Sequence, residues 1–221
     1  MTVVLLWDVD GTLLTTARAG VYALEEAAAE VLGVEVDLQG LATAGLTDAE
    51  VAALVLRTGG GSGDEPTVRA FLASYERRLP AALHRRKGRV LPGVRAVLDD
   101  LAGRDDVLSL LLTGNTPAGA AAKLGHYGLD GYFPDGAFCV GPGPREEIAR
   151  RALALANGAS TVYVIGDTPY DVRAGRAVGA RTVAVASGSY SAAELRAEEP
   201  WTVLERLPEP PRFRALLGID R

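Results

Sequence analysis

Short apolar runs alternate along the chain with longer segments of helical periodicity. The apolar runs lack strict in-and-out alternation, which is typical of parallel strands covered on both faces; they are residues 3–7, 107–112, 137–140, 161–165 and 180–186. Helical periodicity follows them at residues 92–102, 117–127, 145–156 and 170–178. This pattern predicts an α/β fold with a Rossmann-like parallel sheet.

One long segment interrupts the alternation. Between residues 16 and 88 the pattern is helical at 19–32, 47–57 and 66–79, with no convincing strand. The segment lies between the first and second predicted strands. It therefore predicts an inserted α-helical cap domain at 16–88, and an α/β core domain made of residues 1–15 and 89–221.

Composition narrows the function classes. The chain has 28 acidic and 23 basic residues, a net charge of −5, and no basic stripe, which argues against a nucleic-acid binder. No apolar run approaches the length of a membrane span. With the single cysteine Cys139 and two histidines, His84 and His126, a cysteine- or histidine-rich metal site is excluded. We expect a cytoplasmic monomer or small homo-oligomer without membrane contact.

Polar residues follow three of the predicted strands. Asp8 and Asp10 come after the first strand, and side chains two apart on an extended segment point the same way. Taken alone, this pair could equally be an exposed turn. Thr113, followed by Gly114 and Asn115, comes after the second strand, where a hydroxyl and free N–H groups suit a phosphate. An ordinary helix cap is the alternative.

The third polar cluster is Asp167, at the end of the strand 161–165, with Asp171 in the following helical turn. Asp167 alone could also be a helix cap. Together the clusters lie at the carboxyl ends of parallel strands, where open α/β sheets place their sites. Four carboxylates in one crevice require a cation, and a set of oxygen ligands suits Mg²⁺. The sequence therefore predicts a magnesium site.

Three of these segments carry a family resemblance. They read Asp8-Val-Asp-Gly-Thr-Leu13, Leu112-Thr-Gly-Asn115 and Gly166-Asp-Thr-Pro-Tyr-Asp171, and they resemble the first, second and fourth motifs of the haloacid dehalogenase superfamily. Order and spacing are similar to those of its phosphatase branch with a helical cap. In addition, Gly45-Leu-Thr-Asp48 resembles a cap loop of phosphoglycolate phosphatase-like members, which often carry a basic residue where Leu46 stands.

The resemblance implies a mechanism. Asp8 would be the nucleophile that forms an aspartyl-phosphate, and Asp10 the general acid and base. Mg²⁺ would be held by Asp8, the Asp10 backbone carbonyl and Asp167, with support from Asp171. The transferring oxygens of a small phosphorylated metabolite would be bound by Thr113, Gly114 and Asn115.

The third family motif, a lysine before the helix that precedes Asp167, is missing. Arg145 is the best substitute, since it is always charged and grips phosphate in bidentate fashion. An exposed arginine in a first helical turn is the alternative. The sequence places neither Lys123 nor Lys87 at the required position, and Arg150 and Arg151 are interpreted as a solvated helix face.

The sequence thus predicts a Mg²⁺-dependent phosphomonoesterase. A phosphomutase of the same fold is the close alternative. A receiver-type signalling domain also clusters acids, a threonine and a lysine, but the large insert and the missing lysine argue against it.

Overall fold

The chain folds around one parallel β-sheet. The computed structural model describes residues 2–38 and 40–219. Within them six strands pair in the order β5-β4-β1-β6-β7-β8, and each of these pairings is parallel. The strands are β1 (Val3–Trp7), β4 (Val107–Leu112), β5 (Gly136–Ala137), β6 (Thr161–Gly166), β7 (Arg181–Val185) and β8 (Thr202–Leu204). The predicted α/β class is confirmed.

The register of the central strands decides where the polar residues meet. Strand β1 lies between β4 and β6, with Trp7 opposite Leu111 on one side and Ile165 on the other. The three strands therefore end close together at one edge of the sheet. Residues that follow them in the sequence are gathered at that edge.

Helices cover both faces of the sheet. They are α4 (Val94–Ala102), α5 (Pro117–Tyr127), α6 (Arg145–Leu155), α7 (Pro169–Ala177), α8 (Ala192–Ala197) and α9 (Pro210–Leu217), with a 3₁₀ turn at Asp130–Tyr132. Leu5 and Trp7 pack in one hydrophobic cluster with α4 and α9, whereas Val4 and Leu6 pack in another with α6 and α7. Burial on both faces explains the continuous apolar strands. In the described ranges, no helix has both the length and the apolar character that crossing a membrane requires.

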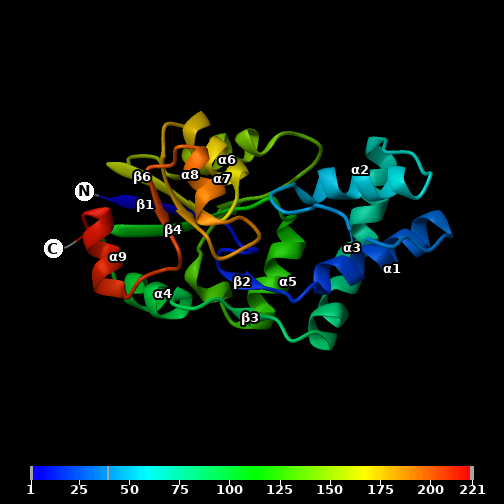
Figure 1. The fold of residues 1–221 in the computed structure, drawn as a ribbon, viewed down its shortest axis with the longest axis horizontal. Helices are drawn as coiled ribbons and strands as arrows, with labels where there is room; N and C mark the ends of the chain where they lie inside the picture. The colour runs from blue at the N-terminus through cyan, green and yellow to red at the C-terminus, as the bar shows by residue number, and fades with distance from the viewer. Residues whose placement is uncertain (1, 39, 220–221) are drawn as a thin grey trace.

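A second group of helices stands beside the sheet (Figure 1). It consists of α1 (Ala19–Leu32), α2 (Asp48–Thr58) and α3 (Glu65–Arg85). A short antiparallel ribbon of β2 (Leu14–Thr15) and β3 (Arg89–Val90) joins this group to the rest of the chain. We retain residues 16–88 as a proposed cap domain and the remainder as the proposed core.

Helix α3 is longer than the sequence predicts. The predicted helix ends at residue 79, but α3 runs through Pro80 to Arg85. Proline has no backbone N–H and removes one helical hydrogen bond. The buried residues Leu79, Ala82 and Leu83 continue the apolar face past this point. Tertiary packing therefore outweighs the local cost of the proline.

The sheet edges also differ from the prediction. The strand predicted at 137–140 is reduced to β5, and Cys139 instead donates its N–H to the carbonyl of Asn115 at 2.9 Å. The elements β2, β3, β8 and α8 were not predicted. They have two to six residues each, too few for hydrophobic periodicity to indicate an element.

Candidate active site

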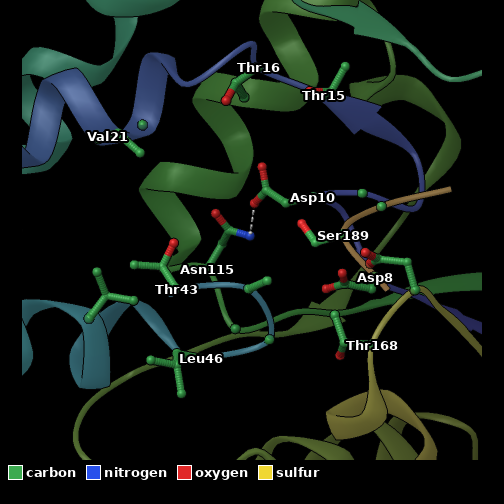
Figure 2. Close-up of a pocket in the computed structure, with 18 of the residues that line it drawn as sticks. Asp8, Asp10, Thr15, Thr16, Val21, Thr43, Leu46, Asn115, Thr168 and Ser189 are labelled. Carbon is green, nitrogen blue, oxygen red and sulfur yellow. Dashed lines mark hydrogen bonds between the residues drawn. The ribbon is translucent and has the colours of Figure 1, made fainter. Parts of the chain in front are cut away.

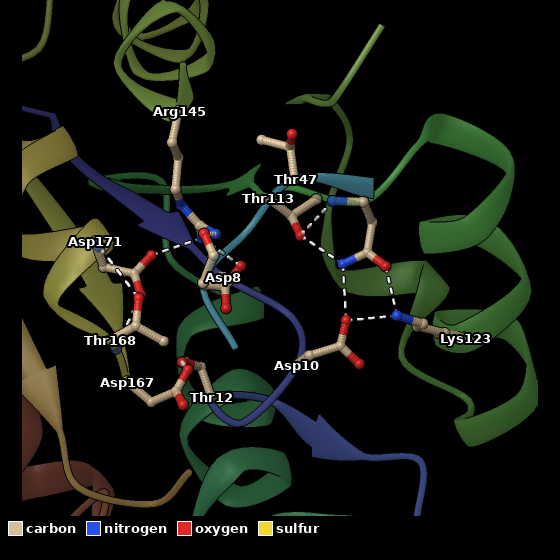
Figure 3. A network of polar contacts seen from close by, with 12 residues as sticks. Asp8, Asp10, Thr12, Thr47, Thr113, Lys123, Arg145, Asp167, Thr168 and Asp171 are labelled. Carbon is tan, nitrogen blue, oxygen red and sulfur yellow. Dashed lines mark hydrogen bonds and ion pairs between the residues drawn. The ribbon is translucent and has the colours of Figure 1, made fainter. Parts of the chain in front are cut away.

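Three predicted carboxylates meet at the sheet edge (Figure 3). Asp8 directly follows β1, and its N–H donates to the Ile165 carbonyl at 2.9 Å. Asp167 directly follows β6. Asp171 lies in the first turn of α7, where its Oδ2 accepts from the N–H and the hydroxyl of Thr168 at 3.0 and 2.7 Å. All three carboxylates are buried.

These carboxylates fit a divalent cation. One oxygen from each of Asp8, Asp167 and Asp171 lies within 4.8 Å of the other two. Carboxylate oxygens are the ligands that hard divalent cations prefer. The carboxylate of Asp10 does not belong to this group among the described residues. Coordination through the Asp10 backbone carbonyl stays a prediction.

The electrostatics of the cluster also favour a bound cation. Burial, the largest effect, raises the pKa of Asp8 to about 7, while Arg145 opposes the rise and Asp171 adds to it. Burial raises the pKa of Asp167 well above its usual value, and the charges of Asp8 and Asp171 raise it further. A cation among these groups would return them to the ionised form.

Two glycines leave room for the Asp167 carboxylate. A Cβ at Gly11, whose φ is +83°, would lie 2.3 Å from Asp167 Oδ2, and one at Gly188 would lie 1.7 Å from the same oxygen. The Thr12 hydroxyl donates to Asp167 Oδ1 at 3.1 Å. The carboxylate is thus held in a cradle that a larger residue at either glycine would fill.

Arg145 is buried beside Asp8. It is the first residue of α6, and its Nη2 donates to Asp8 Oδ1 and to Asp171 Oδ1, both at 2.6 Å. Only 5% of its side chain is exposed. Burial, the largest single effect, lowers the pKa of Arg145, but the charges of Asp171 and Asp8 together raise it overall. The interpretation of Arg145 as an exposed arginine is wrong, and the guanidinium occupies the position expected of a counter-charge.

Asp10 also lines the cleft and is hydrogen-bonded to the segment after β4. Its Oδ2 accepts from Asn115 Nδ2 at 2.8 Å (Figure 2). The same nitrogen donates to Thr113 Oγ1 at 2.8 Å. Thr113 and Asn115 are buried, whereas 43% of the Asp10 side chain is exposed. The residues predicted to bind phosphate therefore lie next to the predicted acid–base group.

Lys123 is a site residue that the sequence interpretation missed. Its Nζ donates to Asp10 Oδ2 and Asn115 Oδ1, both at 2.5 Å. The sequence excluded Lys123 only from the third-motif position, which Arg145 occupies beside Asp8, and the contact of Lys123 with Asp10 was not predicted. A signal was present, because Lys123 shares the buried face of α5 with Gly119, Ala120 and Leu124. A lysine on such a face needs a buried acidic partner.

The loop Gly45–Asp48 of the helical group is hydrogen-bonded to the segment after β4. Asp48 donates its N–H to the Gly114 carbonyl at 2.7 Å, and its Oδ2 accepts from the Thr116 N–H at 2.7 Å. A Cβ at Gly114 would lie 3.0 Å from the Leu46 carbonyl oxygen. Gly114 is thus the point of close approach between this loop and the predicted phosphate-binding segment.

We expect a pH-dependent contribution from Asp48 to stability. Burial, the largest effect, raises the pKa of Asp48 to about 6, while Lys123 opposes the rise. The folded protein then binds this proton more tightly than the unfolded chain does. The stabilisation is complete below the unfolded pKa, near 3.8, and is lost as the pH rises through about 6.

The variant Asp48→Asn, which keeps an oxygen acceptor for Thr116, isolates this effect. Between about pH 4 and pH 7, the free energy of unfolding of the wild type should fall relative to that of the variant by ~2–3 kcal/mol. Urea unfolding of both proteins across this range measures it. A constant difference between the two proteins would show that Asp48 ionises as freely in the fold as in water.

A cleft of about 720 Å³ opens over Asp8 and Asp10, between the helical group and the sheet (Figure 2). Its volume is in the range of small-molecule sites. Arg18 and Arg89 also line it, and the side chain of neither makes a hydrogen bond or ion pair with any residue that the structure describes. The cleft therefore offers positive charge beyond Arg145 and Lys123.

The remaining basic candidates lie outside the cleft. Arg150 is exposed on α6, as expected for a solvated helix face. Arg151 is exposed too, but its Nη2 donates to the Phe138 carbonyl at 2.5 Å. Lys87 is exposed in the segment between α3 and β3. None of the three lines the cleft.

Comparisons with known proteins agree with the motifs. The model of the haloacid dehalogenase-like hydrolase family matches residues 5–176. "Probable phosphatase IndB" of Dickeya dadantii (strain 3937) is 29% identical over 214 residues, which are 92% of this chain and 90% of that protein.

Solved structures share the fold. A predicted phosphatase from Clostridium acetobutylicum aligns with a TM-score of 0.74 at 20% identity, over 98% of each chain. CbbY from Rhodobacter sphaeroides, solved in complex with phosphate, aligns with a TM-score of 0.72 at 20% identity, over 93% of this chain and 95% of that one.

Proposed function

Because the chain belongs to the haloacid dehalogenase-like hydrolases, we propose that it is a Mg²⁺-dependent phosphomonoesterase acting on a small phosphorylated metabolite. The observation that carries this proposal is the placement of Asp8. Its carboxylate lies 2.6 Å from Arg145 Nη2 and inside the three-carboxylate group, at the floor of the cleft. The phosphatase relative supports the same reaction class.

The metal site would be built from Asp8 and Asp167, with Asp171 in support. When bound, Mg²⁺ would offset the repulsion between the Asp8 carboxylate and a phosphate dianion. Arg145 adds a fixed positive charge beside Asp8 and Asp171. Thr113 and the backbone N–H groups of Gly114 and Asn115 would bind the transferring phosphoryl oxygens.

In the first step, an Asp8 oxygen forms a bond to phosphorus as the bond between phosphorus and the leaving oxygen breaks. The leaving oxygen takes the electron pair of that bond and a proton from Asp10. The products are an aspartyl-phosphate and the free alcohol. Asp10 suits this role because it is the more exposed of the two acids and lines the cleft with Asp8.

In the second step, the ionised Asp10 removes a proton from water as the water oxygen bonds to phosphorus. The bond between Asp8 and phosphorus breaks, and inorganic phosphate leaves. Asp8 regains its carboxylate and Asp10 its proton, so the cycle closes.

The substrate proposal rests on the cleft. Its volume of about 720 Å³ suits a small metabolite. The side chains of Arg18 and Arg89, which pair with no described residue, suit a metabolite with negative charge. Residues 16–88, as the proposed cap, supply much of the wall opposite the phosphate site. We therefore assign substrate selection to this segment.

A phosphate-release screen over some dozens of phosphorylated metabolites tests the function. We expect release of inorganic phosphate that needs Mg²⁺ and stops when the metal is removed with EDTA. Metal added back should restore the rate. Sugar monophosphates separate the alternatives, because a phosphomutase converts them to an isomer without net phosphate. If no metabolite yields phosphate or isomer, the proposal fails.

A further inference from the structure

Lys123 lies in the middle of α5, at the contact between that helix and the α1–α3 group. Only 6% of its side chain is exposed. Its ammonium donates to Asp10 (Figure 3) and to Asn115, and Asn115 in turn donates to Asp10. The three side chains thus form a closed ring of hydrogen bonds. Burial lowers the pKa of Lys123, but Asp10, Tyr75 and Asp48 together raise it overall, so the ammonium stays charged.

This ring fixes one oxygen of Asp10 and leaves the other open. Oδ2 accepts from both Lys123 Nζ and Asn115 Nδ2, whereas no described residue donates to Oδ1. The side chain is 43% exposed and lines the cleft. Two donors on one oxygen define the rotamer of the carboxylate, and Oδ1 is left available to carry and transfer a proton.

The two buried cations of the site contact different carboxylates. Arg145 donates to Asp8 and Asp171, and Lys123 donates to Asp10. The nucleophile side and the acid–base side of the cleft therefore each have their own counter-charge. Removing either cation should affect a different part of the reaction.

We propose that Lys123 is a positioning residue that, together with Asn115, orients the Asp10 carboxylate for proton transfer to the leaving group and from water. This inference rests on the proposed function. It assigns Lys123 no contact with the transferring phosphoryl group and no part in activating Asp8. Its loss should slow the steps that move a proton through Asp10 and spare the others.

The test compares two leaving groups in Lys123→Met. 2,4-Dinitrophenolate leaves without a proton, whereas an alkoxide needs one. With 2,4-dinitrophenyl phosphate, we expect the first turnover to be fast, within about threefold of the wild-type rate. The steady-state rate should be ~10²-fold slower than that of the wild type, because hydrolysis of the aspartyl-phosphate needs Asp10 as the base. With the best alkyl phosphate of the screen, the first turnover itself should be ~10²-fold slower, while KM changes by less than about threefold.

Lys87→Met is the matched control, because Lys87 is the other lysine of the chain and is exposed outside the cleft. It should behave as the wild type with both substrates. A Lys123→Met enzyme that matches this control would overturn the inference. Equal loss of the first turnover with both substrates would also overturn it, because Lys123 would then act on Asp8 or the phosphate.

A double-mutant cycle keeps the test decisive if Lys123→Met folds poorly. Lys123 is the buried partner of this ion pair, so Asp10→Asn alone leaves a buried charge without its carboxylate, whereas the double variant removes that charge. In an Asp10→Asn background, Lys123→Met should therefore fold and should change kcat by less than about threefold, since Asp10 no longer transfers protons. A further ~10²-fold loss in that background would contradict the inference. A wild type that releases no phosphate would instead remove the proposed function.

Discussion

Replacing Asp8 with asparagine should abolish phosphate release while the protein stays folded. The amide oxygen is a poor nucleophile toward phosphorus, so we expect kcat to fall by at least ~10⁴-fold. The fold should persist because asparagine keeps the volume and Arg145 retains its second partner, Asp171. Burial of one carboxylate fewer also removes part of the repulsion that raises the pKa of Asp167.

Phosphate release, circular dichroism and beryllium fluoride binding measure this prediction. Beryllium fluoride mimics an acyl phosphate and should bind the wild type with Mg²⁺ but not Asp8→Asn. Asp105→Asn, an exposed aspartate in the turn before β4, is the matched control and should retain full activity. Phosphate release by Asp8→Asn at the rate of the wild type would rule out Asp8 as the nucleophile.

Replacing Arg145 with alanine should have the second largest effect. The guanidinium is the counter-charge nearest to Asp8, at 2.6 Å, and it is almost completely buried. We expect kcat/KM to fall by roughly ten- to a thousand-fold, equivalent to ~1.4–4 kcal/mol of transition-state stabilisation. Part of this loss reflects Asp8 and Asp171 left together without their shared donor.

Two variants calibrate that result. Arg145→Lys should recover part of the activity, since the charge is kept without the planar donor geometry. Arg150→Ala, which removes an exposed arginine from the same helix, should leave kcat/KM unchanged. Normal kinetics in Arg145→Ala would mean that the counter-charge for Asp8 comes from another group.

The sequence predicted the sheet and the carboxylates well because one physical rule connects them. Parallel strands buried on both faces appear as continuous apolar runs, and their carboxyl ends lie at one edge. Asp8 and Asp167 each directly follow such a run, so their meeting could be foreseen. The approach of Arg145 to Asp8 depends on the path of the loop before α6, which no periodicity encodes.

Lys123 and the end of α3 show where prediction stopped. Lys123 is a site residue because one face of α5 lies against both the strand ends and the helical group. This contact depends on how segments distant in the sequence pack together, which the local pattern does not encode. Helix α3 continues past Pro80 because the side chains of Ala82 and Leu83 are buried there. In both cases packing between distant segments outweighed the local signal.

Reductive trapping of the intermediate tests the central claim most directly. Borohydride reduces an acyl phosphate to an alcohol and so converts a phosphorylated aspartate to homoserine, which peptide mass spectrometry locates. In wild-type enzyme quenched during turnover with Mg²⁺ and substrate, the account predicts homoserine at position 8, and none when substrate is omitted. Homoserine at Asp10, Asp167 or Asp171 in place of Asp8 would contradict it.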